Sequence, residues 1–82
     1  ETIRWFANAL DKVYEQAIQP RKNTFATVTR EALGVVGIIT PWNDPLVVAF
    51  WKITPALLMG NSIVVKPAEQ SSFSIIKVAE LA

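Results

Sequence analysis

Two short runs of apolar, mostly β-branched residues constrain the fold of this chain more than any other feature. The first, GVVGIIT, covers residues 34–40, and the second, SIVVK, covers residues 62–66. The 21 residues between them, Pro41 to Asn61, exceed the dozen or so that a connection between parallel strands requires. The first run is apolar on both faces, which is typical of a parallel strand covered by helices on each side. The spacing therefore predicts a βαβ unit and an α/β fold.

The connecting segment carries the signals of a helix at both of its ends. Asp44 can cap the free N–H groups of a first turn, and Pro45 suits the first helical position, where an N–H has no partner. Gly60 and Asn61 indicate the end of the helix. We therefore expect one long helix between the two strands.

A proline inside this expected helix predicts an irregularity. Pro55 should kink the helix near Trp51, or split it so that Thr54 caps a second helix. The broad apolar face of the helix is expected to contain Leu46, Val47, Phe50, Trp51, Thr54, Leu57 and Leu58.

The flanking segments predict three further elements. Apolar residues spaced by three and four predict an amphipathic helix over residues 1–20, ended by Pro20. The stretch TFATVTR has strand composition, and its threonine-rich pattern suits an exposed ribbon over residues 24–32, a candidate oligomerisation arm. A last amphipathic helix should follow PAEQSS, capped by Ser71 or Ser72. Residues 34–82 would then form a βαβα unit.

Composition narrows the partners that we expect. The chain has 82 residues, of which eight are basic and seven acidic, and its formal net charge is +1. Such an even balance predicts neither nucleic acid nor a membrane surface as a partner. Because the chain has no cysteine and no histidine, no metal site is expected. The 51% hydrophobic content is high for so small a body, so we expect further chain to cover part of its apolar surface.

Two loops should meet at one edge of the sheet. PWND follows the first strand and PAEQ follows the second, and ligands of parallel sheets bind beyond the carboxyl ends of the strands. The dinucleotide fingerprint G-x-G-x-x-G is absent, because Gly34 and Gly37 lie before and within the strand. From the residues alone, the unit could bind a nucleotide in another way or serve a purely structural purpose.

Several short motifs, in the order in which they occur, resemble those of a known family. The tripeptide PWN, the following WK…PAL…GN helix and the KPAEQ loop are similar to the cofactor-binding region of NAD(P)-dependent aldehyde dehydrogenases. The resemblance is close over residues 30–81 and looser over residues 1–29. It implies that residues 1–82 are part of one Rossmann-like NAD-binding domain, without the catalytic domain.

The resemblance assigns the first loop to the cofactor and to catalysis. Ile39, Thr40, Pro41 and Trp42 would lie along the cofactor, and so would Asn43. The carboxamide N–H of Asn43 would also donate to the oxyanion that forms when a cysteine thiolate attacks an aldehyde. From the residues alone, Asn43 is better explained as a turn or cap residue beside Asp44.

The same resemblance assigns the second loop to the adenosine end of the cofactor. Lys66 and Glu69 would hydrogen-bond the ribose hydroxyls, while Pro67 and Ala68 shape the loop and contact the cofactor. A carboxylate repels the 2′-phosphate of NADP, so Glu69 favours NAD over NADP. Without the family, Lys66 and Glu69 are explained as solvated loop residues.

A charge-relay role carries over to Lys52 from some family members, although a lysine whose stem packs and whose ammonium reaches water explains it as well.

The chain departs from the family pattern at Ala32, where proline is frequent. It departs again at Asp44, where many relatives have an aromatic or small residue. A carboxylate beside Asn43 could alter the substrate entrance.

The resemblance also implies what the intact protein does. It would oxidise a small-molecule aldehyde to a carboxylic acid with NAD, through a cysteine thiohemiacetal and a thioester. The nucleophilic cysteine and the general-base glutamate would lie outside these residues, so the fragment alone should be inactive. We expect a cytoplasmic homodimer or homotetramer. A catalytically inactive binding or structural relative and an enzyme that acylates coenzyme A remain as alternatives.

Overall fold

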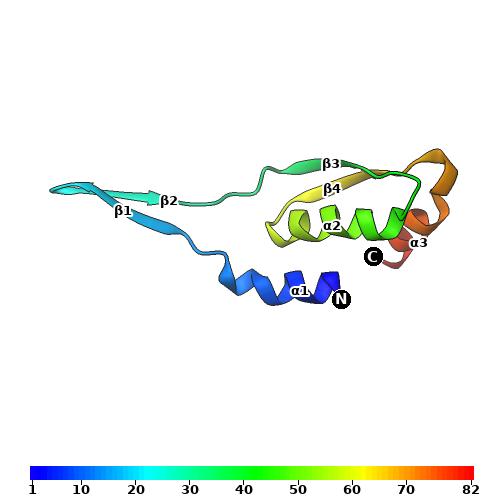
Figure 1. Ribbon diagram of the computed structural model, residues 1–82. Helices are drawn as coiled ribbons and strands as arrows, with labels where there is room; N and C mark the ends of the chain where they lie inside the picture. Colours follow the sequence, from blue (N-terminus) through cyan, green and yellow to red (C-terminus); the bar gives the residue numbers. More distant parts are fainter.

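The computed structural model describes all residues from Glu1 to Ala82 and divides them into an α/β body and a long hairpin that projects from it (Figure 1). In the body, the two-stranded sheet of residues 35–39 and 62–66 lies over the helices of residues 45–58 and 73–81. The helix of residues 2–9 lies against the helix of residues 45–58. The elements are α1 (Thr2–Ala9), β1 (Gln16–Arg21), β2 (Thr24–Val28), β3 (Val35–Ile39), α2 (Pro45–Leu58), β4 (Ser62–Lys66) and α3 (Phe73–Leu81), with 3-10 turns at Leu10–Lys12 and Glu69–Ser71.

The predicted βαβ unit is confirmed. β3 and β4 pair in parallel, in an unbroken register from Val35 opposite Ser62 to Ile39 opposite Lys66. Helix α2 makes the crossover between them. Both strands therefore end at the same edge of the sheet.

One face of this sheet forms the core. Ile38 of β3, Ala49 and Ile53 of α2 and Ile75 of α3 are buried, and the partly buried side chains of Val36, Ile63 and Val65 pack against them. The opposite face is open, since Val35, Ile39 and Val64 are exposed. The expectation that helices cover both faces of β3 is thus met on one face only within these 82 residues.

Helix α2 begins and ends where the sequence predicts, but its start differs in detail. Asp44 occupies the N-cap position and Pro45 the first turn, yet the Asp44 side chain makes no capping hydrogen bond. The backbone of Asp44 is left-handed, with φ 49° and ψ 49°. Capping side chains belong to residues in the extended region, so the predicted cap is wrong. Only the main chain starts the helix, with Val48 N donating to Asp44 O at 3.1 Å.

Pro55 does not split the helix, because α2 is continuous through it. The Thr54 hydroxyl donates instead to the carbonyl of Phe50 at 2.7 Å, a bond within the helix rather than a second cap. The predicted apolar face is also displaced. The buried residues of α2 are Ala49 and Ile53, neither of which belongs to the predicted set.

The C-terminal end of α2 is fixed by a Schellman motif. Gly60, with φ 78°, donates through N–H to Leu57 O at 2.9 Å, and Asn61 donates to Ala56 O at 3.1 Å. The side chain of Asn61 adds two bonds, from Nδ2 to Ala56 O at 3.0 Å and from Gly34 N to Oδ1 at 3.1 Å. Asn61 therefore ties the end of α2 to the start of β3.

The N-terminal helix is shorter than predicted. It ends at Ala9, one 3-10 turn follows, and residues 16–21 form β1 rather than helix. β1 pairs with β2 in an antiparallel hairpin, whose turn includes Asn23 in the left-handed region at φ 67°. Pro20, predicted as a helix stop, lies at the irregularity between Ile18 and Arg21, where a residue without an N–H is tolerated. The ribbon predicted over residues 24–32 is present but shorter, as the strand Thr24–Val28.

We predict that Asn61→Ala lowers the free energy of unfolding of the intact protein by about 1 to 2 kcal/mol, because two side-chain hydrogen bonds of ordinary strength are lost, to Gly34 N and to Ala56 O. Chemical denaturation measures the change. Asn8→Ala is the matched control: its side chain lies exposed on α1 without a hydrogen bond, so it should change stability by less than about 0.5 kcal/mol. Equal midpoints for the two variants would show that the Asn61 bonds do not stabilise the fold.

Candidate functional site

The site begins where β3 and β4 end side by side. The loop after β3 contains Pro41, Trp42 and Asn43, and the loop after β4 begins at Pro67. Just beyond the strand pair, Thr40 N donates to Lys66 O at 3.1 Å. This bond extends the parallel ladder by one step and holds the bases of the two loops together.

Neighbouring residues at the end of β3 lie in opposite environments. Ile39 is 73% exposed on the open face, whereas Thr40 is 2% exposed. The Thr40 Oγ1 atom is buried and has no hydrogen-bond partner in the chain. Thr40 therefore presents no side chain to solvent at this edge, while Ile39 offers an exposed apolar side chain.

The first loop is open to solvent. Pro41, Trp42 and Asn43 are all exposed, and the indole of Trp42 is 67% exposed. None of the side-chain hydrogen bonds within the chain involves Asn43. The carboxamide of Asn43 is thus available as a donor, as an oxyanion-binding group must be.

The second loop presents two free charges. Lys66 ends β4 and Glu69 opens the 3-10 turn, and both are exposed. The ion pairs of the chain are Lys12–Asp11 and Lys77–Glu80, so neither Lys66 nor Glu69 is neutralised by a partner. A free ammonium and a free carboxylate suit the hydroxyls of a ribose, which both donate and accept hydrogen bonds. This pair of one donor and one acceptor fits the sugar of a nucleotide.

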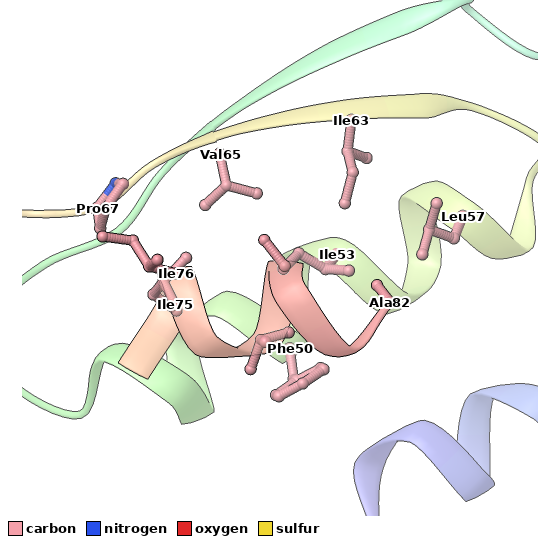
Figure 2. A pocket seen from close by; sticks show the side chains of 11 residues that line it. Phe50, Ile53, Leu57, Ile63, Val65, Pro67, Ile75, Ile76 and Ala82 are labelled. Carbon is pink, nitrogen blue, oxygen red and sulfur yellow. The ribbon is translucent and has the colours of Figure 1, made fainter. Parts of the chain in front are cut away.

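An apolar groove lies behind this edge, between α2, β4 and α3 (Figure 2). Ile63 and Val65 point from β4 toward the helices, and Pro67 joins the groove to the second loop. The groove is lined by Phe50, Ile53, Leu57, Ile63, Val65, Pro67, Ile75, Ile76, Val78, Ala79 and Ala82. It contains no charged or hydrogen-bonding side chain, so it is a packing surface and offers nothing to a reaction.

Lys52 lies apart from the two loops. It is exposed on α2 and borders a shallow groove along β3 with Ile39, Trp51 and Pro55. The structure thus brings the first and second loops together and leaves Lys52 on the flank of the same strand.

Asn61, expected from the sequence only as a helix stop, also accepts a hydrogen bond from Gly34 N through its side chain. The signal was present in its position, because a Gly-Asn pair between a helix and a strand can bond both through one side chain. Asn61 lies at the opposite end of the sheet from the loops and supports them only through the register of the strands.

Comparison with known proteins identifies the chain. The model of the aldehyde dehydrogenase family matches residues 1–82. The chain belongs to the aldehyde dehydrogenase family. It is 48% identical over 81 residues to aminoacetaldehyde dehydrogenase of Pseudomonas aeruginosa and 46% identical over 80 residues to the NADP/NAD-dependent aldehyde dehydrogenase PuuC of Escherichia coli. These matches cover 99% and 98% of the chain and 16% of each relative.

Solved aldehyde dehydrogenases share the fold. The betaine aldehyde dehydrogenase of Staphylococcus aureus in complex with NAD⁺ is 43% identical, with a TM-score of 0.90 over 98% of this chain and 16% of that one. The predicted family and α/β fold are confirmed. The predicted cofactor agrees with the family, since PuuC is named NADP/NAD-dependent and the Staphylococcus aureus enzyme holds NAD⁺.

None of the helices is long and apolar enough to cross a membrane.

We predict that Thr40→Val leaves the free energy of unfolding unchanged or raises it by about 1 kcal/mol, because it replaces a buried hydroxyl without a partner by a methyl group of similar size. Thr54→Val is the matched control, and it should cost about 1 kcal/mol through loss of the bond to Phe50 O. Chemical denaturation of the intact variants compares them. A loss of more than about 1 kcal/mol in Thr40→Val would mean that the hydroxyl has a partner in the intact protein.

Proposed function

We propose that the intact protein containing this chain is an NAD-dependent aldehyde dehydrogenase that oxidises an aldehyde to a carboxylic acid. The observation that carries the proposal is the shared edge of β3 and β4. Parallel pairing and the hydrogen bond from Thr40 N to Lys66 O hold the first loop (PWN) and the second loop (KPAE) side by side. The chain that contains both loops is a member of the aldehyde dehydrogenase family. The chain spans about one sixth of its relatives, so the remaining machinery belongs to other parts of the protein.

Asn43 is the catalytic residue that this chain contributes. Its exposed, unpaired carboxamide lies in the loop after β3, and an N–H donor there can stabilise the negative charge that develops on the aldehyde oxygen. A charge-relay role for Lys52 stays a prediction, supported only by the family resemblance. The nucleophilic cysteine and the general-base glutamate lie outside this chain, which has no cysteine.

Lys66 and Glu69 form the adenosine end of the cofactor site. The rest of the cofactor site is lined by Ile39, Trp42, Pro67 and the main chain of the two loops. The shape of the loops is set by Thr40, Pro41 and Ala68. When bound, NAD supplies the hydride acceptor for the oxidation. The carboxylate of Glu69 accepts hydrogen bonds from ribose hydroxyls and disfavours a 2′-phosphate, which makes NAD the preferred form over NADP.

The hairpin of β1 and β2 serves assembly in this proposal. Almost every residue of both strands is exposed, and an isolated two-stranded hairpin is marginally stable in water. Its exposed apolar side chains, Ile18, Phe25 and Val28, need a covering surface. A homodimer or homotetramer, in which the hairpin meets another subunit, supplies that surface.

We predict that Asn43→Ala in the intact enzyme slows the chemical step by roughly 10² to 10³-fold, because the oxyanion loses a preorganised donor. Single-turnover kinetics measure the chemical step, and equilibrium titration measures the dissociation constant of NAD, which should change by no more than about twofold. A loss confined to NAD affinity would contradict the oxyanion role.

We predict that Glu69→Gln lowers the ratio of kcat/KM for NAD to that for NADP by roughly tenfold, because the repulsion of the 2′-phosphate disappears. Steady-state kinetics with each cofactor measure the ratio. Glu80→Gln is the matched control, since Glu80 pairs with Lys77 on the exposed side of α3 and should leave the ratio unchanged. An unaltered ratio in Glu69→Gln would remove Glu69 as the selector.

A further inference from the structure

Gly37 is the one glycine of this chain whose presence the fold of these residues does not explain. The chain has three glycines. Gly34 and Gly60 have φ of 105° and 78°, in the left-handed region that favours glycine. Gly37 lies in the middle of β3 without a positive φ, and a Cβ atom built on it meets nothing within 4 Å. A larger residue would therefore fit, and it would suit a strand better than glycine does.

Gly37 interrupts a row of apolar side chains on the open face of the sheet. Val35 and Ile39 stand on either side of it along β3 and are 72% and 73% exposed. Val64 of β4 is paired directly with Gly37 and is 63% exposed. The glycine is thus a notch among β-branched side chains. Such a notch lets another segment come close to the backbone of the strand.

We propose that an α-helix from another part of the intact chain crosses the open face at Gly37 and contacts the backbone of β3 there. A parallel sheet is expected to have helices on both faces, and the glycine fixes the point at which the second layer comes closest. Val35 and Val64 flank the helix at this point. Ile39, at the end of the strand, stays at the cofactor edge.

The topology of the sheet identifies which helix this is. Helices α2 and α3 both lie on the core face, where Ile53 and Ile75 are buried, so neither reaches the open face. β3 pairs with β4 alone, and its other edge is free. Because parallel crossovers are right-handed, a connection that extends the sheet beyond this free edge runs over the face opposite to α2. The chain covers 16% of its relatives, so the intact protein has ample chain to supply that connection.

A helix suits the notch better than the cofactor does. Ligands of parallel sheets bind beyond the carboxyl ends of the strands, whereas Gly37 lies two residues before the last residue of β3, about 7 Å inside the edge. The flanking side chains of Val35 and Val64 offer no hydrogen-bonding group to a nucleotide. Their apolar surface fits the apolar stripe of a helix.

Two substitutions in the intact protein test the contact, because Gly37→Ala adds one carbon atom at this point and Gly37→Val adds three. Under a closely packed helix, each added carbon displaces helix atoms. The midpoint of thermal unfolding should therefore fall by about 2 to 4 °C in Gly37→Ala and further in Gly37→Val. On an uncovered strand the trend has the opposite sign, since alanine restricts the unfolded chain and valine favours strands. Differential scanning calorimetry measures the midpoints.

The expected result is a falling midpoint with the affinity for NAD and the oligomeric mass unchanged. A raised or unchanged midpoint in Gly37→Ala overturns the proposal, and this variant decides alone if Gly37→Val gives no soluble protein. A loss of NAD affinity, measured by equilibrium titration, would place the cofactor at the notch. Dissociation of the oligomer, measured by light scattering, would place a second subunit there. Both of these results also overturn the proposal.

Discussion

The parallel pairing of β3 with β4 is the constraint on which the rest of the molecule depends. Because both strands run the same way, their following loops lie at one edge, and the bond from Thr40 N to Lys66 O sets the distance between the loop bases. A shift of one residue in this register would exchange the faces of the strand. Ile38 would leave the core, and the two loops would no longer start level with each other.

The sequence predicted the parts of the fold that depend on local chemistry. The positions of β3, α2 and β4 follow from β-branched runs, from Pro45 at a helix start and from Gly60 at a helix end, and each of these signals acts within one or two turns of chain. The PWN and KPAE loops could be assigned to one edge because parallel strands leave no alternative. The roles of Asn43, Lys66 and Glu69 came from the family resemblance and not from these signals.

The failures of prediction have physical reasons in pairing and packing. Residues 16–18 continue the helical spacing of α1, but antiparallel pairing with β2 provides backbone bonds that no periodicity reveals. The buried side of α2 could not be found from the most apolar residues, because the fully buried residue is the small Ala49, whereas Trp51 is 59% exposed. The left-handed backbone of Asp44 is equally invisible in the sequence, since aspartate at an N-cap predicts an extended residue.

The two ends of α2 differ in how firmly they are held. At the end near Asn61, four hydrogen bonds join the helix to its own last turn and to Gly34. At the end near Asn43, the chain enters through an exposed loop and a residue without a side-chain cap. Pro55 also leaves the carbonyl of Trp51 without its usual donor, since proline has no N–H. Local opening should therefore cost less free energy at the Asn43 end of the helix than at the Asn61 end, because fewer hydrogen bonds have to break there.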